Sequence, residues 1–197
     1  AYRGVLLMLL QKHVQFRIVT ARTLAAIHGT VLVLPDVRVL SEQELAGVGV
    51  FAAQGGRVVL TGKTDAQLDG LKKAARFPDQ PELRYLDAAQ KDFYSVNPAS
   101  EPALLHAIET KNDVQVDASQ NVVVHEARVN GRTCLFLANF AGLKPDVNET
   151  PTTQQGIRVT AQAALGKKLH WLPFMGTETT VEGQASGHSV TFTLPAL

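Results

Sequence analysis

Two short, continuous apolar runs constrain the fold of the first half of this chain more than any other feature. Residues 30–34 (TVLVL) and 57–60 (RVVL) lack the alternation of a half-exposed strand, and such runs are typical of parallel strands buried on both faces. Between them Ser41 begins a capping box with Glu44, and apolar residues follow at helical spacing. The order strand, helix, strand predicts right-handed βαβ units and an open parallel sheet.

Further elements are expected around these two strands. The sequence predicts a helix at 2–12, a short strand at 14–19 and a brief helix at 22–27. After the second apolar run we expect a polar helix that extends toward Arg76, and one further strand at 83–86. The sheet built from these elements is expected to lack its first strand.

After Asn112 the pattern becomes that of an all-β domain. Asn130-Gly131 lies between two strand patterns and is the strongest short-range signal for a hairpin. No helix is expected between the strands, so the sequence predicts a small antiparallel β-sandwich. Its seven expected strands are 113–117, 121–129, 132–140, 157–161, 168–172, 179–182 and 189–194.

The change of pattern predicts two domains. An α/β domain is expected at 1–100, a linker at 101–112 that contains a helix, and the β-sandwich at 113–197. Because the chain enters the α/β pattern at once from Ala1, we expect the first domain to be truncated at its N-terminus.

The composition excludes several classes of function. The chain has 197 residues, with 19 Lys and Arg against 18 Asp and Glu, so it lacks the basic excess of a nucleic-acid-binding protein. The single cysteine, Cys134, excludes an intrachain disulfide and a multi-cysteine metal site. No stretch reaches the roughly 18 to 20 apolar residues of a membrane span. We therefore expect a soluble protein with no nucleic-acid partner, no membrane partner, no metal and no cofactor.

Two glycine-containing segments match nucleotide-binding motifs in their letters but not in their position. In residues 56–64 the glycines flank the strand, whereas those of a P-loop follow the strand so that their N–H groups can surround phosphate. Residues 47–52 read G-x-G-x-x-A in the middle of the capped helix, where no helix N-terminus is offered to a pyrophosphate. Neither segment predicts a nucleotide site.

Four polar residues follow the carboxyl ends of predicted parallel strands. They are Asp36, Lys63, Thr64 and Asp65. Ligands bind at this edge in open α/β sheets, and Asp36 with Asp65 would suit the carboxylate pair of a glycoside hydrolase, one as acid and one as base. The alternative is that these loop carboxylates cap the next helix or face water.

The segment 170–175 (HWLPFM) combines the single tryptophan, Trp171, with Phe174. An exposed Trp171 would provide a platform on which a sugar ring stacks. The alternative is that Trp171 packs in the core of the sandwich or between domains, because its large apolar surface favours burial.

The order of elements in the first half resembles the class I glutamine amidotransferase-like domain. The segments involved are TVLVLPDV at 30–37, SEQEL at 41–45, Gly55-Gly56 and RVVLTG at 57–62. More narrowly, they are similar to the trimerisation domain of family 42 β-galactosidases and related multidomain glycoside hydrolases, where a small C-terminal β-sandwich follows. The strand with CLFLANF at 134–140 resembles that sandwich. The resemblance covers nearly the whole chain and implies a flavodoxin-like open parallel sheet.

The resemblance also implies that the chemistry of the amidotransferases is missing. In those enzymes the strand equivalent to 57–60 runs into a G-x-C-x-G elbow. Aligning Gly62 with its first glycine places Thr64 at the nucleophile position and Ala66 at the second glycine, and no downstream His-x-Glu supplies a base. The catalytic (β/α)₈ barrel of the glycosidases needs about 250 residues or more and does not fit in this chain.

Together these observations predict the non-catalytic structural and oligomerisation portion of a larger bacterial glycoside hydrolase-like protein. The expected partners are the N-terminal catalytic barrel of the parent chain and further copies of this chain, with carbohydrate as a third candidate. One alternative function is a carbohydrate-binding module, and another is a degenerate amidotransferase-like hydrolase that uses Thr64. The compartment is left open between the cytoplasm, the periplasm and secretion.

Overall fold

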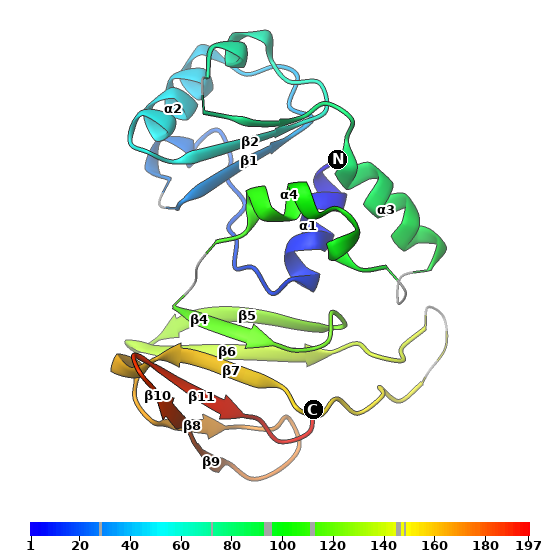
Figure 1. The fold of residues 1–197 in the computed structure, drawn as a ribbon, viewed down its shortest axis with the longest axis vertical. Coiled ribbons are helices and arrows are strands. Elements are labelled where there is room, and N and C mark those ends of the chain that lie inside the picture. The colour runs from blue at the N-terminus through cyan, green and yellow to red at the C-terminus, as the bar shows by residue number, and fades with distance from the viewer. Residues whose placement is uncertain (28, 72, 93–95, 111–112, 145–146, 148) are drawn as a thin grey trace. The chain divides into compact units, whose positions relative to one another are not determined.

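The computed structural model describes residues 1–27, 29–71, 73–92, 96–110, 113–144, 147 and 149–197. The chain divides into two compact units, Ala1–Thr110 and Lys111–Leu197 (Figure 1). Each unit has its own buried apolar core. Each half of the sequence therefore supplies the side chains around which it folds.

The first unit is an α/β structure built on a three-stranded parallel sheet with the order β1-β2-β3. Its elements in chain order are α1 (Tyr2–Gln11), η1 (Leu24–Ala26), β1 (Val31–Pro35), α2 (Glu42–Ala53), β2 (Arg57–Thr61), η2 (Ala66–Gly70), β3 (Ala75–Phe77), α3 (Pro81–Lys91), η3 (Pro98–Ser100) and α4 (Pro102–Ile108).

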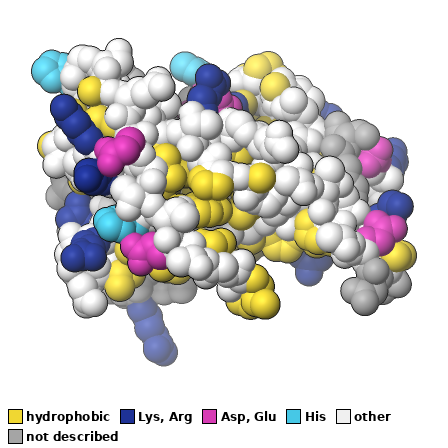
Figure 2. All heavy atoms as spheres, turned by 90° about the horizontal axis from the view of Figure 1, so that it is seen from below, with side chains coloured by type: hydrophobic (Ala, Val, Ile, Leu, Met, Phe, Trp, Pro, Cys, Tyr) yellow, Lys and Arg dark blue, Asp and Glu magenta, His cyan; other side chains and the backbone are white. Residues whose placement is uncertain are grey.

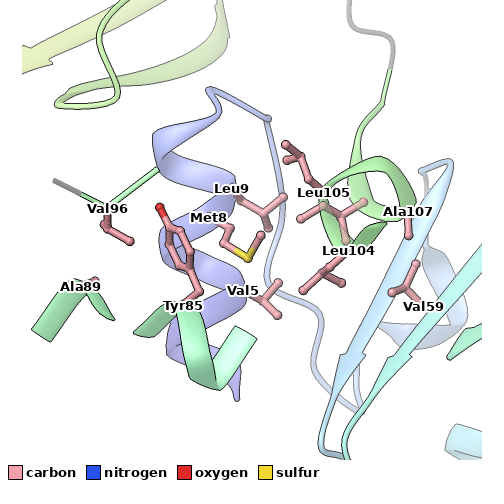
Figure 3. Packing of buried hydrophobic residues seen from close by; sticks show 11 residues of the cluster. Val5, Met8, Leu9, Val59, Tyr85, Ala89, Val96, Leu104, Leu105 and Ala107 are labelled. Carbon is pink, nitrogen blue, oxygen red and sulfur yellow. The ribbon is translucent and has the colours of Figure 1, made fainter. Parts of the chain in front are cut away.

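Side chains pack against both faces of this sheet, which explains the continuous apolar runs. Successive residues of a strand point to opposite faces. Leu34 and Leu60 accordingly join one core cluster with Phe51 of α2, whereas Val33 and Val59 pack in a second cluster. Figure 3 shows the second cluster, where side chains of α1, α3 and α4 meet near β2. A strand buried on both faces has no solvent-facing positions for polar residues.

The predicted capping box forms at the start of α2. The Ser41 Oγ accepts a hydrogen bond from the Glu44 N–H at 3.3 Å, and Glu44 Oε2 accepts one from the Ser41 N–H at 2.7 Å. These bonds satisfy two of the backbone donors that a helix N-terminus leaves free. The prediction of a capped helix between two buried strands is confirmed.

The strand predicted at 14–19 is absent. The Val14 N–H donates to the Leu9 carbonyl at 3.0 Å and so closes the end of α1. Residues 16–18 are then exposed. The β-branched residues of this segment therefore lie in an irregular connection, and none of the described strands pairs with them.

The stretch after β2 also differs from the prediction. In place of a polar helix extending toward Arg76, the structure has the short η2 followed by β3, in which Arg76 pairs with Leu60 of β2. β3 provides hydrogen-bond partners for the backbone N–H and C=O groups on the edge of β2 opposite β1. A parallel strand of three residues is too short to show a period in the sequence.

The segment 83–86, predicted as a strand, belongs to α3. Pro81 stands in the first turn, where its missing N–H costs nothing. Glu82, Tyr85 and Ala89 are buried at helical spacing along one side of the helix. This side packs against α1, so a helix with a buried stripe replaces the expected strand.

The helix α4 falls inside the segment predicted as a linker. Its residues Leu104, Leu105 and Ile108 are buried in the same cluster as Met8 of α1. The first compact unit therefore extends to Thr110.

The described strand pairs of the second unit are all antiparallel. They form a four-stranded sheet with the order β10-β11-β7-β4 and two ribbons, β5-β6 and β8-β9. The strands are β4 (Val114–Asp117), β5 (Val122–Val129), β6 (Arg132–Asn139), β7 (Arg158–Gln162), β8 (Lys168–Trp171), β9 (Thr179–Glu182), β10 (Gln184–Ser186) and β11 (Ser189–Thr193), with the short η4 (Ala163–Leu165) after β7.

The predicted Asn-Gly hairpin joins β5 to β6. Asn130 and Gly131 both adopt positive φ angles, 50° and 77°, as a two-residue loop between twisted strands requires. The strand β10 was not predicted, because all three of its residues are exposed and only pairing with β11 defines it. The structure thus confirms an α/β portion followed by an antiparallel β portion, while the flavodoxin-like assignment stays a prediction.

Candidate functional site

The structure brings three of the predicted site residues together where the strands of the parallel sheet end. Asp36 follows β1, and Lys63 and Asp65 lie in the turn after β2. The Asp36 Oδ1 accepts a hydrogen bond from the Lys63 N–H at 2.9 Å, and the Asp65 N–H donates to the Val37 carbonyl at 3.0 Å. Hydrogen bonds to backbone groups therefore join the loop after β1 to the loop after β2. We refer to residues 62–66, together with Asp36, as the β2 turn.

Asp36 holds this edge in shape. Besides Lys63, it binds Arg38, whose Nη2 lies 2.9 Å from Oδ2. The Arg38 hydrogen bond and the Lys63 N–H lower the pKa of the Asp36 carboxyl, although partial burial opposes them. A general acid in glycoside hydrolysis needs a raised pKa instead. The surroundings of Asp36 therefore favour the ionised form of its carboxylate.

Asp65 has the same kind of role on the other loop. Its Oδ1 accepts from the Gln67 N–H at 3.0 Å, which caps η2, and its Oδ2 accepts from the Leu40 N–H at 2.9 Å. These two backbone donors lower the pKa of Asp65, with burial opposing them. Both oxygens of this carboxylate thus fix backbone groups, one just before α2 and one in the first turn of η2.

Gly62 allows the side chains of this edge to approach the chain closely. Its φ of +67° lies in the left-handed region, and a Cβ at this position would come within 2.7 Å of Asp36 Oδ1 and 2.6 Å of Gln80 Nε2. Gln80, which precedes α3, was not identified from the sequence. The space beside Gly62 is therefore filled by side chains of the fold.

Thr64 and Lys63 complete the β2 turn. Thr64, which the sequence analysis aligned with the amidotransferase nucleophile, is half-buried, and Lys63 is exposed. A threonine hydroxyl needs an adjacent base to act as a nucleophile. The neighbouring carboxylate is Asp65, whose two oxygens already accept backbone N–H groups.

A buried polar pair under this edge was also missed by the sequence analysis. The Thr61 Oγ1 donates to Glu82 Oε1 at 2.6 Å, and both residues are fully buried. Among the described residues, no hydrogen-bond partner contacts Glu82 Oε2. Pro81 could have indicated the position of Glu82, because proline favours the first turn of a helix and Glu82 follows it directly.

Trp171, the fifth predicted site residue, lies in the second unit. It is half-buried and packs against the apolar core of that unit, together with Leu169 and Val181 of the same ribbon. In contrast, Phe174 is 100% exposed. The flat aromatic surface open to solvent in this segment is therefore that of Phe174.

Asn139 has a structural role that the sequence analysis did not assign. Its Nδ2 donates to the carbonyls of Thr152 and Leu197 at 2.9 and 3.0 Å, and its Oδ1 accepts from the Ala141 N–H at 2.9 Å. One amide side chain thus joins the end of β6 to the last residue of the chain.

Comparison with known proteins adds one finding. No family model and no curated protein matches this chain. The chain is similar to a solved structure, the α-L-fucosidase isoenzyme 2 from Paenibacillus thiaminolyticus, with a TM-score of 0.64 and 18% sequence identity. The two proteins share a fold.

The match covers 98% of this chain and 43% of the fucosidase chain. Both compact units are therefore included in the shared fold. This chain spans less than half the length of the protein that it matches.

In the described parts of the chain, no group of three or more His, Cys, Asp or Glu residues could hold a metal ion. Within the same residues, no helix has the length and apolar character needed to cross a membrane.

Proposed function

We propose that this chain is a non-catalytic structural and oligomerisation portion of a larger glycoside hydrolase-like protein. The observation that supports it most is the engagement of all four carboxylate oxygens of Asp36 and Asp65 in hydrogen bonds that shape the loops. Both groups have lowered pKa values, which suits a framework role rather than proton transfer.

The shared fold supports the same proposal. The matched protein is named as an α-L-fucosidase and is more than twice as long as the matched region. The parent protein would then contain a catalytic barrel that this chain packs beside. A family 42 β-galactosidase-like parent, with an amidotransferase-like trimerisation domain, is the narrower form of the proposal.

A hydrolysis assay tests the proposal. The purified chain would be incubated with aryl α-L-fucosides, aryl β-galactosides and glutamine, and product release would be compared with that of Thr64→Ala. We expect no release above the rate without protein for either form. Turnover by the wild-type chain that is lost in Thr64→Ala would overturn the proposal in favour of a degenerate hydrolase.

A carbohydrate-binding module is the second candidate, and the full exposure of Phe174 favours it. Aromatic faces stack on apolar sugar faces as they stack on other rings. Calorimetric titration with galactose and fucose would measure such binding. Saturable heat that is lost in Phe174→Ala but retained in Phe136→Ala, which alters another exposed phenylalanine, would support this candidate.

A further inference from the structure

The two methionines of the chain have opposite surroundings. Met8 belongs to α1, and Met175 lies in the loop between β8 and β9. Met8 is 0% exposed, whereas Met175 is 84% exposed. A thioether is oxidised by a peroxide only where the reagent can reach the sulfur atom. The two side chains therefore differ in the property that decides whether oxidation occurs.

Met175 lies almost wholly in solvent. Its loop, residues 172–178, connects β8 to β9 without regular structure. Leu172 and Phe174 in the same loop are also exposed. Figure 2 shows the end of the second unit where Figure 1 places β8 and β9, and apolar side chains are exposed on this face. A small peroxide molecule can therefore reach the Met175 sulfur without any opening of the fold.

Met8 is enclosed by the core of the first unit. Figure 3 shows its side chain inside the cluster that contains Val5, Leu9, Tyr85 and Leu104. A peroxide reaches this sulfur only when α1 separates from the helices that cover it. Core segments open rarely, because opening costs much of the stability of the folded state. The rate of Met8 oxidation is thus limited by the small population of opened molecules.

We propose that Met175 is a modification site, which hydroperoxides convert to methionine sulfoxide in the folded protein while Met8 stays reduced. With hydrogen peroxide, a lone pair of the thioether sulfur attacks one peroxide oxygen. The S–O bond forms, the O–O bond breaks, and the sulfur is oxidised by two electrons. The second oxygen leaves as water, after the proton of the transferred oxygen has passed to it. The modification would occur whether or not the chain belongs to a glycoside hydrolase-like protein.

Oxidation would have different consequences at the two positions. A sulfoxide is polar, whereas the thioether that it replaces is apolar. At Met175 the new S–O group would be hydrated, so the loop would lose apolar surface while the fold keeps its stability. At Met8 the same group would be buried among apolar side chains without a hydrogen-bond partner, which lowers stability. The exposed methionine can therefore change the surface of the protein without unfolding it.

Two other side chains could take up oxygen and must be distinguished from the methionines. Cys134 in β6 and Trp171 in β8 are both half-buried. Trypsin, which cleaves after Lys and Arg unless Pro follows, places Met8 in residues 4–12, Cys134 in 133–158 and Met175 in 169–197. Trp171 shares the last peptide, and fragmentation of that peptide in the mass spectrometer separates it from Met175.

A time course of oxidation followed by peptide mapping tests the proposal. The folded chain would be treated with hydrogen peroxide beside N-acetylmethionine amide, a fully accessible reference in the same solution. The variants are Met175→Leu and, as the matched control, Met8→Leu. Exchange of methionine for leucine nearly conserves volume, so both variants should fold. A parallel reaction in guanidinium chloride measures the two methionines in the unfolded chain.

We expect Met175 to gain one oxygen atom at a rate within about tenfold of the reference, and Met8 to react at least about tenfold more slowly than Met175. The two rates should become alike in guanidinium chloride. Met175→Leu should lose the fast uptake, and Met8→Leu should keep it. Methionine sulfoxide reductases A and B with a thiol reductant should remove the oxygen. The urea midpoint of the singly oxidised chain should equal that of the untreated chain.

Several results would overturn the proposal. Oxidation of Met8 as fast as that of Met175 in the folded chain would show that the core does not protect it. Oxidation of Met175 more than about tenfold slower than the reference would show that its loop is covered. Rates that still differ in guanidinium chloride would mean that the fold is not the cause. Fast uptake that persists in Met175→Leu, or that the reductases leave in place, would assign the oxygen to another side chain. A lowered urea midpoint after oxidation of Met175 would contradict the claim that only the surface changes.

Discussion

The β2 turn and the loop between β8 and β9 differ in what their side chains contact. At the turn, the polar groups of Asp36 and Asp65 are bound to backbone N–H groups and to Arg38. In the loop between β8 and β9, Phe174 and Met175 are almost wholly exposed to solvent. The polar groups of the turn stabilise the fold, whereas the apolar side chains of the β8–β9 loop contribute little to it.

This contrast shows that residue type alone is a poor guide to function. A carboxylate after a parallel strand suggests chemistry, yet its role depends on whether its oxygens are free. A phenylalanine suggests a core, yet its role depends on whether other side chains cover it.

The largest expected difference lies between two phenylalanines of the second unit. Phe192 is 4% exposed and belongs to the core, whereas Phe174 is 100% exposed. Phe192→Ala should lower the free energy of unfolding by about 3 to 5 kcal/mol, and Phe174→Ala should change it by less than about 0.5 kcal/mol. Urea unfolding followed by the fluorescence of Trp171, the single tryptophan, reports on this unit. Equal losses would place Phe174 in the core and remove the contrast.

The next largest effect is expected at Gly62. An alanine there would be strained by the φ of +67° and would displace Gln80 and Asp36, so Gly62→Ala should cost about 2 to 4 kcal/mol. Gly70→Ala is the matched control, because no atom lies within 4 Å of its Cβ position. Urea unfolding followed by far-UV circular dichroism measures the helices of the first unit. A Gly62→Ala protein as stable as Gly70→Ala would mean that the β2 turn is loosely built.

A smaller loss is expected from Asn139→Ala. This change removes three hydrogen bonds that join β6, the following loop and Leu197. The free energy of unfolding of the second unit should fall by about 1 to 3 kcal/mol, read from Trp171 fluorescence. Gln184→Ala changes an exposed residue of β10 and should leave the midpoint of unfolding unchanged. An unchanged midpoint in Asn139→Ala would show that the chain end is held by other contacts.

The smallest effect concerns pH. The pKa of Asp65 is below its ordinary value of 3.8 in the folded chain, so the folded state binds its proton less readily than the unfolded state does. The contribution of Asp65 to stability is therefore present above pH 3.8 and is lost as the pH falls through the lowered pKa. Asp65→Asn should be less stable than the wild type at neutral pH, and the two should converge in acid. A constant difference between thermal midpoints from neutral pH to acid would contradict this linkage.

Much of the fold could be predicted because its signals are local. Ser41 and Glu44 define a helix start within four residues, and Asn130-Gly131 defines a hairpin within two. Buried strands are visible as continuous apolar runs. Such signals need no knowledge of distant segments.

The elements that escaped prediction depend on distant partners. β3 is a strand only because Ala75–Phe77 pairs with β2, and β10 only because it pairs with β11. In α3, the four residues 83–86 suggest a strand when taken alone, whereas the buried spacing of Glu82, Tyr85 and Ala89 defines a helix over a longer window.

The sequence indicated that Asp36 and Asp65 follow parallel strands, but it did not indicate which groups their oxygens contact. The sequence placed Asp36 and Asp65 after parallel strands, and the structure brings their loops together. It could not show that the carboxylates accept N–H groups from Lys63, Gln67 and Leu40, because those bonds depend on the path of the backbone.

Titration of amide chemical shifts measures most directly whether the β2 turn serves the fold or a ligand. Glutamine, galactose and fucose would be added in turn to the isotope-labelled chain, and the signals of residues 62–66 would be followed. We predict no saturable shift in these signals, in the wild type or in Thr64→Ala. Saturable shifts in the wild type that disappear in Thr64→Ala would contradict the claim that this turn only supports the structure.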